Sequence, residues 1–239
     1  MVNKVKEFYE NKSSDPNNDK LVPGLTSFFY KLLKKYEVTR IEKVYSLLDS
    51  GNRILDLGVG GGQLLAKCKI NKKFNKLYGI DISSKVIDEA KNNIKKESRN
   101  LENVEIKYSD VNNGIPYPNK YFDSVTCIAV LEHLFDPIFF VKEVKRVLVN
   151  KGKIIVEVPN LVWLPRRLSI IFGKLPITGN EVGWDAGHLH YFTFGSLAKL
   201  LNDNSFEVER VTTSGIFSFV RQIMPSLLGG DIIIKAIKN

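Results

Sequence analysis

The chain of 239 residues is 44% hydrophobic and 26% charged, a composition typical of a globular domain that excludes a disordered chain. A chain of this length buries roughly 70–75% of its unfolded surface, so its core needs no disulfide or metal. Its two cysteines, Cys68 and Cys127, are too few for a disulfide framework or a four-ligand zinc site. Because both stand in apolar runs, as buried reduced thiols do, we expect a cytoplasmic protein.

The positive charge is unevenly distributed. The chain has 35 basic and 26 acidic residues, a net charge of +9, and 51–100 alone holds 11 basic against 5 acidic residues. Clustered lysines can neutralise nucleic-acid phosphates. Aromatic residues are sparse among these lysines, however, which disfavours a stacking platform for single strands. We therefore favour a solvated surface and expect no nucleic-acid partner.

No stretch reaches the ~20 uninterrupted apolar residues of a membrane span. The first 20 residues are polar and lack the apolar centre of a signal peptide. The sequence thus predicts a soluble protein without a membrane span.

The first 50 residues are expected to form a helical cap on a domain covering 51–239. Apolar residues recur at helical spacing over 25–36. Thr39 and Glu42 then form the pattern of a capping box that opens a second helix. Gly51 is the expected end of that helix.

From residue 53 onward, short apolar strands alternate with helical patterns. One further helix opens with Asp136 as its N-cap and Pro137 in its first turn, and Gly152 is expected to end it. This alternation predicts a mostly parallel sheet with helices on both faces. The expected strands are 53–57, 76–82, 104–108, 122–130 and 153–158, and the expected helices are 63–70, 84–96 and 137–149.

The alternation stops after residue 160. About 30 residues, 161–192, precede the next expected helix at 193–201, and strands at 206–212 and 231–237 follow. A connection longer than ~12–15 residues is usually functional or disordered. Because 161–192 carries two tryptophans, two adjacent arginines and two histidines, we expect a functional insert that acts as a lid.

A glycine-rich loop follows the strand at 53–57. Gly58, Gly60 and Gly62 stand where glycine permits a tight turn and close approach of a ligand to the free N–H groups of a helix start. The dinucleotide fingerprint Gly-x-Gly-x-x-Gly would need its third glycine at Gln63, so a nicotinamide dehydrogenase is disfavoured.

Three acidic residues, Asp56, Asp81 and Asp110, stand at the ends of successive strands. Parallel strands bring their carboxyl ends to one edge of the sheet, where open α/β sheets bind ligands. There Asp81 can accept hydrogen bonds from a ribose diol, and Asp110 can accept from an adenine amino group. Each acid alone is more often a helix cap or a turn residue, but with the glycine spacing they indicate a binding site.

With these motifs, the segment 51–160 resembles the class I S-adenosylmethionine-dependent methyltransferases. The glycine loop with Asp56 is similar to the first motif of that family, and Asp81 to its ribose-binding acid. Residues 123–137 resemble the fourth-strand segment of the ubiquinone-biosynthesis O-methyltransferase type. Two later segments are similar to the same broad group and to the methionine biosynthesis protein W-like branch, namely 188–206 and 225–238.

The resemblance implies a Rossmann-like, doubly wound α/β fold with a seven-stranded, mostly parallel sheet whose last strand is antiparallel. It also implies S-adenosylmethionine as the cofactor. No metal site is expected. The residues expected to bind the cofactor are Asp56, Gly58, Gly60, Gly62, Asp81, Ile82, Asp110, Val111 and Val130.

Methyl transfer requires the two reactants to be held in line, and it requires a base only when the acceptor is a hydroxyl. The Asn/Asp-Pro-Pro-Tyr motif that resembling enzymes use on base amines is absent after the fourth strand. We therefore expect a small-molecule acceptor and favour O-methylation. His133 follows the fourth strand and His188 lies in the insert, and each is either a structural residue or the catalytic base.

Other functions remain open at this point. The W-like resemblance permits a cofactor-binding regulatory protein that supports a partner enzyme. The lysine clusters permit an RNA methyltransferase. Nitrogen and carbon are alternative nucleophiles to oxygen.

Overall fold

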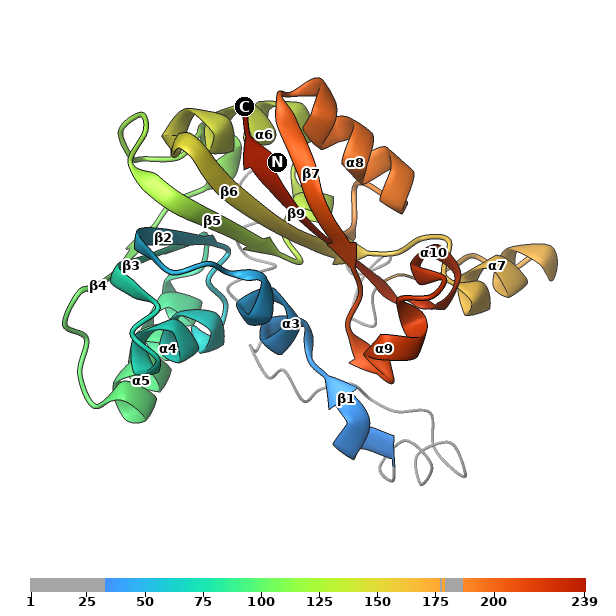
Figure 1. Cartoon of the computed structure of the whole chain (residues 1–239), viewed down its shortest axis with the longest axis horizontal. Helices are drawn as coiled ribbons and strands as arrows, with labels where there is room; N and C mark the ends of the chain where they lie inside the picture. The colour runs from blue at the N-terminus through green and yellow to red at the C-terminus, as the bar shows by residue number, and fades with distance from the viewer. Residues whose placement is uncertain (1–32, 177, 179–186) are drawn as a thin grey trace.

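The computed structural model describes residues 33–176, 178 and 187–239, which are built around one large sheet (Figure 1). Seven strands form this sheet in the order β4-β3-β2-β5-β6-β9-β7. Strands β2 to β6 pair in parallel, and β9 is antiparallel to both of its neighbours. The predicted mostly parallel sheet with an antiparallel last strand is confirmed. The bounds are β2 Gly51–Leu57, β3 Phe74–Asp81, β4 Val104–Tyr108, β5 Phe122–Ile128, β6 Leu148–Pro159, β7 Phe206–Thr212 and β9 Asp231–Lys238.

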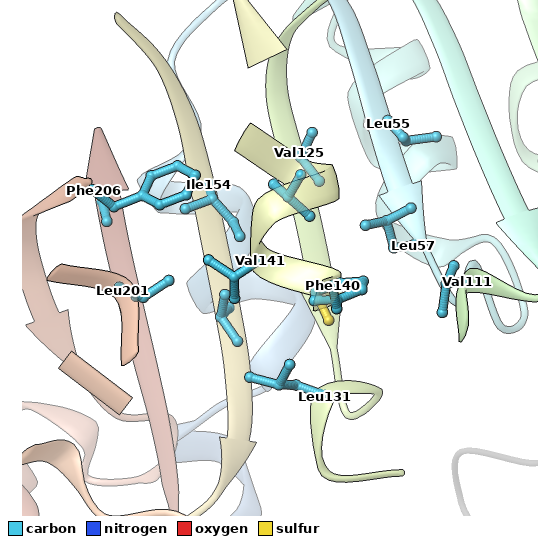
Figure 2. Close-up of a cluster of buried hydrophobic side chains, with 14 of the residues drawn as sticks. Leu55, Leu57, Val111, Val125, Leu131, Phe140, Val141, Ile154, Leu201 and Phe206 are labelled. Atoms are coloured by element: carbon cyan, nitrogen blue, oxygen red, sulfur yellow. The ribbon is translucent and has the colours of Figure 1, made fainter. Parts of the chain in front are cut away.

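Helices cover both faces of the sheet, because successive strand side chains point to opposite faces. Ile54 of β2 packs with the helices on one face, and its neighbour Leu55 packs with those on the other. Figure 2 shows the second cluster, in which Phe140 and Leu201 contribute from helices to the layer over the sheet. The first face carries α3 Arg40–Leu47, α4 Gln63–Ile70 and α5 Ser84–Ser98, and the second carries α6 Pro137–Val147 and α8 Phe194–Asp203.

The predicted helix starts are confirmed by their caps. Thr39 Oγ1 accepts a hydrogen bond from the Glu42 N–H, and the Glu42 carboxylate accepts from the Thr39 N–H, at 3.2 and 3.0 Å. The Asp136 carboxylate accepts from the first N–H groups of α6, both at 2.9 Å. These side chains satisfy donors that a helix leaves unpaired at its start.

Three predicted ends are wrong, each for a backbone reason. Gly51 does not end α3, because Leu48 already turns to extended backbone and Gly51 begins β2. Gly152 likewise lies inside β6, since α6 ends at Val147. The strand expected to reach Val130 stops at Ile128, because Ala129 adopts a φ of +52°.

Short elements complete the described chain. The insert 161–192 contains a helix that the sequence reading missed, α7 Leu164–Ile171, which projects away from the sheet (Figure 1). The helix expected over 25–36 and most of the N-terminal cap lie outside the described residues. Among the helices of the described residues, none has the length and apolar character of a membrane span. The remaining elements are η1 Lys34–Tyr36, β1 Glu37–Val38, η2 Val111–Asn113, η3 Leu131–His133, β8 Gly215–Ile216, α9 Ser218–Arg221 and α10 Pro225–Leu228.

Candidate functional site

The glycine loop joins β2 to α4 at the carboxyl edge of the sheet. Gly58, Gly60 and Gly62 have φ values of +72°, +51° and +76°, a region that costs other residues steric strain. The N–H groups of Gly58 and Val59 donate to the carbonyl of Ile80 in β3, which holds the loop against the neighbouring strand.

The three glycines differ in what a side chain would meet. A Cβ on Gly58 would lie 2.2 Å from Val130 Cγ2, and one on Gly62 would lie 3.0 Å from the Ala90 carbonyl oxygen. A Cβ on Gly60 would meet only the Gly58 carbonyl oxygen, at 4.0 Å. The missing side chains of Gly58 and Gly62 therefore permit packing, whereas Gly60 keeps a space open at the loop.

Asp81 ends β3 directly beside this open space. One carboxylate oxygen accepts a hydrogen bond from the Gly60 N–H at 3.2 Å, and the other accepts from the Ser83 N–H at 3.0 Å. Ser83 in turn caps α5. A carboxylate oxygen can accept more than one hydrogen bond, so Asp81 keeps capacity for a diol.

Asp56 lies within β2 and is almost fully buried. Its carboxylate accepts a 2.6 Å hydrogen bond from the Thr126 hydroxyl of β5. Burial raises the pKa of Asp56 to about 7, the Thr126 bond opposes this shift, and the nearby Asp81 charge adds to it. Burial thus favours the neutral form of Asp56 relative to an exposed carboxyl.

Asp110 caps the short helix η2, with its carboxylate accepting from the Asn112 N–H at 2.9 Å. Asp110 also lines, together with Ile82 and Tyr108, a cavity of about 460 Å³ at the end of β4. The structure therefore brings Asp81, Ile82 and Asp110 to one edge, as the sequence predicts. The side chain of Val111 points into the apolar core instead, so Val111 offers a ligand only its backbone.

The next part of the site follows β5. Glu132 and His133 lie in η3, and Glu132 is only 1% exposed. His188 comes from the end of the insert, and its Nε2 and that of His133 each lie 4.0 Å from Glu132 Oε1. The two imidazole rings are 4.7 Å apart. The structure thus unites the two predicted catalytic histidines around one carboxylate.

Backbone contacts fix this end of the insert. The N–H groups of Leu189 and His190 both donate to the Glu132 carbonyl, at 2.8 and 3.0 Å. His188 Nδ1 lies 2.6 Å from the Thr178 hydroxyl, and His133 Nδ1 lies 3.3 Å from the Gly187 carbonyl oxygen. Hydrogen bonds at their Nδ1 atoms thus orient both rings.

Glu132, His133 and His188 also form a candidate metal-binding group, since their ligand atoms all lie within 4.8 Å of one another. Two tetrahedral ligands of one zinc ion at bond lengths of about 2.1 Å lie about 3.4 Å apart, whereas Glu132 Oε1 lies 4.0 Å from both Nε2 atoms. The three side chains would therefore have to draw together to hold an ion.

The sequence reading missed Glu157 of β6. It lies next to Ile128 of β5, is 3% exposed, and has Oε2 at 3.9 Å from Arg40 Nη1. Burial raises the pKa of Glu157 to about 7, and the Arg40 charge opposes this shift. The available signal was a single acid inside the apolar run Ile154-Ile-Val-Glu157-Val158. Such a run predicts a buried strand, and a glutamate is rarely buried unless it has a partner.

Known proteins share this sequence pattern. Residues 55–156 match the family model described as a methyltransferase domain. The chain is 30% identical over 127 residues to the ubiquinone biosynthesis O-methyltransferase of Coxiella burnetii, with 52% of this chain and 49% of that protein covered. It is 27% identical over 192 residues to the ubiquinone/menaquinone biosynthesis C-methyltransferase of Laribacter hongkongensis, with 73% and 77% covered. The chain spans about half the length of the first curated relatives it matches.

Among solved structures, the magnesium protoporphyrin IX methyltransferase of Synechocystis PCC 6803 with bound SAH superposes with a TM-score of 0.68. The match covers 100% of both chains at 16% identity, a level at which the likeness shows the fold.

The fold, with its glycine loop at the carboxyl edge of a parallel sheet, defines a Rossmann-like α/β protein. Together with the sequence matches, it makes the chain similar to the class I S-adenosylmethionine-dependent methyltransferases, whose cofactor is S-adenosylmethionine. The residues present fit that molecule. Gly60 leaves room for close approach to the backbone, and Asp81 stands beside it with acceptor capacity for the ribose hydroxyls.

Proposed function

We propose that this protein transfers a methyl group from S-adenosylmethionine to a hydroxyl of a small molecule. The observation that carries the proposal is the convergence of two groups at one edge of the sheet. The glycine loop with Asp81 would hold the cofactor, and the group of Glu132, His133 and His188 follows β5, the next strand beside β2.

Cofactor binding rests on backbone and carboxylate groups. Gly60 would let the methionine part approach the start of α4, Gly58 and Gly62 would shape the loop by permitting its close packing, and Asp81 would accept from the ribose hydroxyls. Ile82 and Asp110 would receive the adenine in the cavity at the end of β4. When bound, the cofactor supplies an electrophilic methyl carbon on a sulfonium.

The remaining assigned residues, Asp56, Val111 and Val130, would act from beneath or beside the cofactor. Val130 packs against Gly58 and would thereby fix the position of the glycine loop. Val111 would contribute its backbone only. Asp56 holds a negative charge under the loop when ionised, and its link to Thr126 fixes the carboxylate.

Proton removal from the acceptor hydroxyl falls to His133 or His188 in this proposal. A neutral imidazole can take a proton near neutral pH. The Glu132 carboxylate, 4.0 Å from both Nε2 atoms, would stabilise the positive charge that either ring acquires. The 161–192 insert supplies His188, so it would close the acceptor side as a lid.

A small-molecule acceptor is supported by the contacts that several lysines of the basic segment 51–100 make within the protein. Lys67 and Lys73 lie over the ring of Tyr45, and Lys69 donates to the Glu102 carbonyl. Lys67 and Lys69 lie in the last turn of α4, whereas the glycine loop lies at its first. These cations are therefore not placed along an acceptor groove for a nucleic acid. We also propose a cytoplasmic location, because Cys68 and Cys127 are buried free thiols.

Oxygen as the attacking atom is the finer part of the proposal. The Coxiella burnetii relative is named an O-methyltransferase and the Laribacter hongkongensis relative a C-methyltransferase. The histidine pair favours oxygen, since a hydroxyl must lose its proton. An activated carbon that is already deprotonated would need no such base.

The experiment is methyl transfer from S-adenosylmethionine carrying a labelled methyl, with phenols and catechols, enolisable carbon acids and an RNA oligonucleotide as acceptors. We expect label in the hydroxyl compounds as an ether. Label in the carbon acids or in RNA would refute the hydroxyl acceptor, but it would support S-adenosylmethionine as the cofactor. Binding of S-adenosylhomocysteine with no transfer to any acceptor would favour the regulatory alternative.

A further inference from the structure

A basic hollow lies at the edge of the sheet opposite the glycine loop. It is a shallow, open depression of about 290 Å³ and is lined by residues of three parts of the chain. They are Asn119 and Lys120 before β5, Lys142, Lys145 and Arg146 of α6, and Lys238 at the end of β9. Figure 1 shows the carboxyl terminus of the chain beside α6, as this grouping requires.

The positive charge of the hollow is largely uncompensated. Among the residues that the structure describes, the one acid that pairs with a lining cation is Glu143, which holds Arg146 at 2.8 Å and accepts from the Ile115 N–H. No ion pair joins Lys120, Lys142 or Lys145 to an acid of the described chain. Four lysines therefore surround this space without a counter-ion from the part of the chain that the structure describes.

Lys238 makes the hollow more than a group of surface lysines. Its side chain is buried, and its Nζ donates to the Leu148 carbonyl oxygen at 2.6 Å. Burial lowers the pKa of Lys238, and the charges of Lys120 and Lys145 lower it further. A buried cation exposed to two like charges is stabilised when an anion enters the same space.

The hollow is held in shape by the backbone. Lys120 adopts a left-handed φ of +52°, which is uncommon for a residue other than glycine. Its N–H donates to the Arg146 carbonyl, and Arg146 donates to Asn119 Oδ1 at 2.9 Å. The negative end of the α6 dipole favours cations in the last turn, which accounts for Lys145 and Arg146. It does not account for Lys120 or Lys238.

We propose that this hollow is a second ligand site, which binds a small phosphate polyanion of the pyrophosphate type. Lysines from three parts of the chain converge on it, and its volume of about 290 Å³ lies just below the range of ligand pockets, about 300–1,000 Å³. Ammonium groups bind phosphate oxygens through short, charge-assisted hydrogen bonds. The site does not depend on the proposed methyl transfer, because it lies at the other edge of the sheet.

The test is titration calorimetry of the full chain with inorganic pyrophosphate at low ionic strength. The variant is Lys120→Ala with Lys145→Ala, which removes two cations from the rim and leaves the buried Lys238 in place. We expect pyrophosphate affinity to fall at least about tenfold, because each lysine supplies a charge-assisted contact. Binding of S-adenosylhomocysteine should not change, which shows that the variant is folded.

The matched control is Lys95→Ala with Lys96→Ala, which removes the same charge from the exposed face of α5. The control should keep pyrophosphate affinity within about threefold of the unmodified chain, since only distant, screened charges are lost. Equal losses in the two double variants would overturn the site, since the effect would then be one of net charge. Absence of pyrophosphate binding, with RNA bound steeply as salt falls, would overturn it in favour of a nucleic-acid surface.

Discussion

Replacing Gly60 by alanine should separate cofactor binding from stability. The added Cβ would meet only the Gly58 carbonyl oxygen, at 4.0 Å, so no atom of the protein has to move. The stability cost is then the left-handed backbone alone, about 1–2 kcal/mol. The same methyl group would occupy the space that the loop leaves open, so we expect the affinity for S-adenosylhomocysteine to fall at least about tenfold.

Gly62→Ala is the matched comparison, since Gly62 has a similar φ of +76°. Its Cβ would lie 3.0 Å from the Ala90 carbonyl oxygen and 3.1 Å from Ile94 Cδ1, between α4 and α5. Crowding of this kind costs about 1–3 kcal/mol beyond the backbone strain, for a loss of about 2–5 kcal/mol in all. We expect Gly62→Ala to be less stable than Gly60→Ala. Its affinity for S-adenosylhomocysteine should stay within about threefold of that of the unmodified chain.

Urea unfolding followed by circular dichroism gives the two stabilities, and titration calorimetry with S-adenosylhomocysteine gives the affinities, at a temperature where both variants are folded. The reasoning fails if Gly60→Ala binds normally while Gly62→Ala does not. It also fails if Gly60→Ala is the more destabilised of the two, because the space at Gly60 would then be filled by the protein.

Three further predictions concern charged and titratable groups. Asp81→Ala should lower S-adenosylhomocysteine affinity at least about tenfold in calorimetry, because charge-assisted bonds to the ribose are each worth about 1.5–3 kcal/mol; unchanged affinity in a folded variant would refute the assignment. Burial raises the pKa of Asp56 to about 7, so its contribution to stability is complete below the unfolded pKa near 4 and is lost as pH rises through 7. Asp56→Asn should therefore reduce the fall in unfolding free energy between about pH 5 and 8, by an amount of order 2 kcal/mol; an identical pH profile would contradict the burial argument. His133→Ala or His188→Ala should lower turnover by ~10²–10⁴-fold with cofactor affinity nearly intact. Near-full turnover in both variants would refute a histidine base and indicate that catalysis depends on positioning of the reactants alone.

The features that could be predicted from the sequence are those with a local cause. The Thr39 and Asp136 caps, the glycine loop and the apolar strands each depend on neighbouring residues, and the strand order of the parallel sheet brings Asp81 and Asp110 to one edge. The helix ends were wrong at Gly51 because a helix can end in extended backbone without glycine, as Leu48 does. Glycine is a common C-terminal signal but not a required one.

The acceptor side could not be assembled from the sequence. Glu132 and His188 are far apart along the chain, and their approach depends on the backbone bonds of Leu189 and His190 to the Glu132 carbonyl. Elements of two residues, such as the strand pair β1 and β8, are too short to show a period. The apolar run around Glu157 signals a buried acid, but the run does not reveal its partner, because Arg40 lies on a helix far away along the chain.

The place of β9 between β6 and β7 has a consequence for how the protein is made. A nascent chain emerges from its amino end, so β7 leaves the ribosome before the strand that joins it to the sheet. Strands β2 to β6 can pair during synthesis, whereas β7 and α8 have no strand to dock beside until β9 has emerged. We therefore expect the far side of the sheet to assemble last, and the exposed edge of β6 to be the surface that chaperones meet in the growing chain.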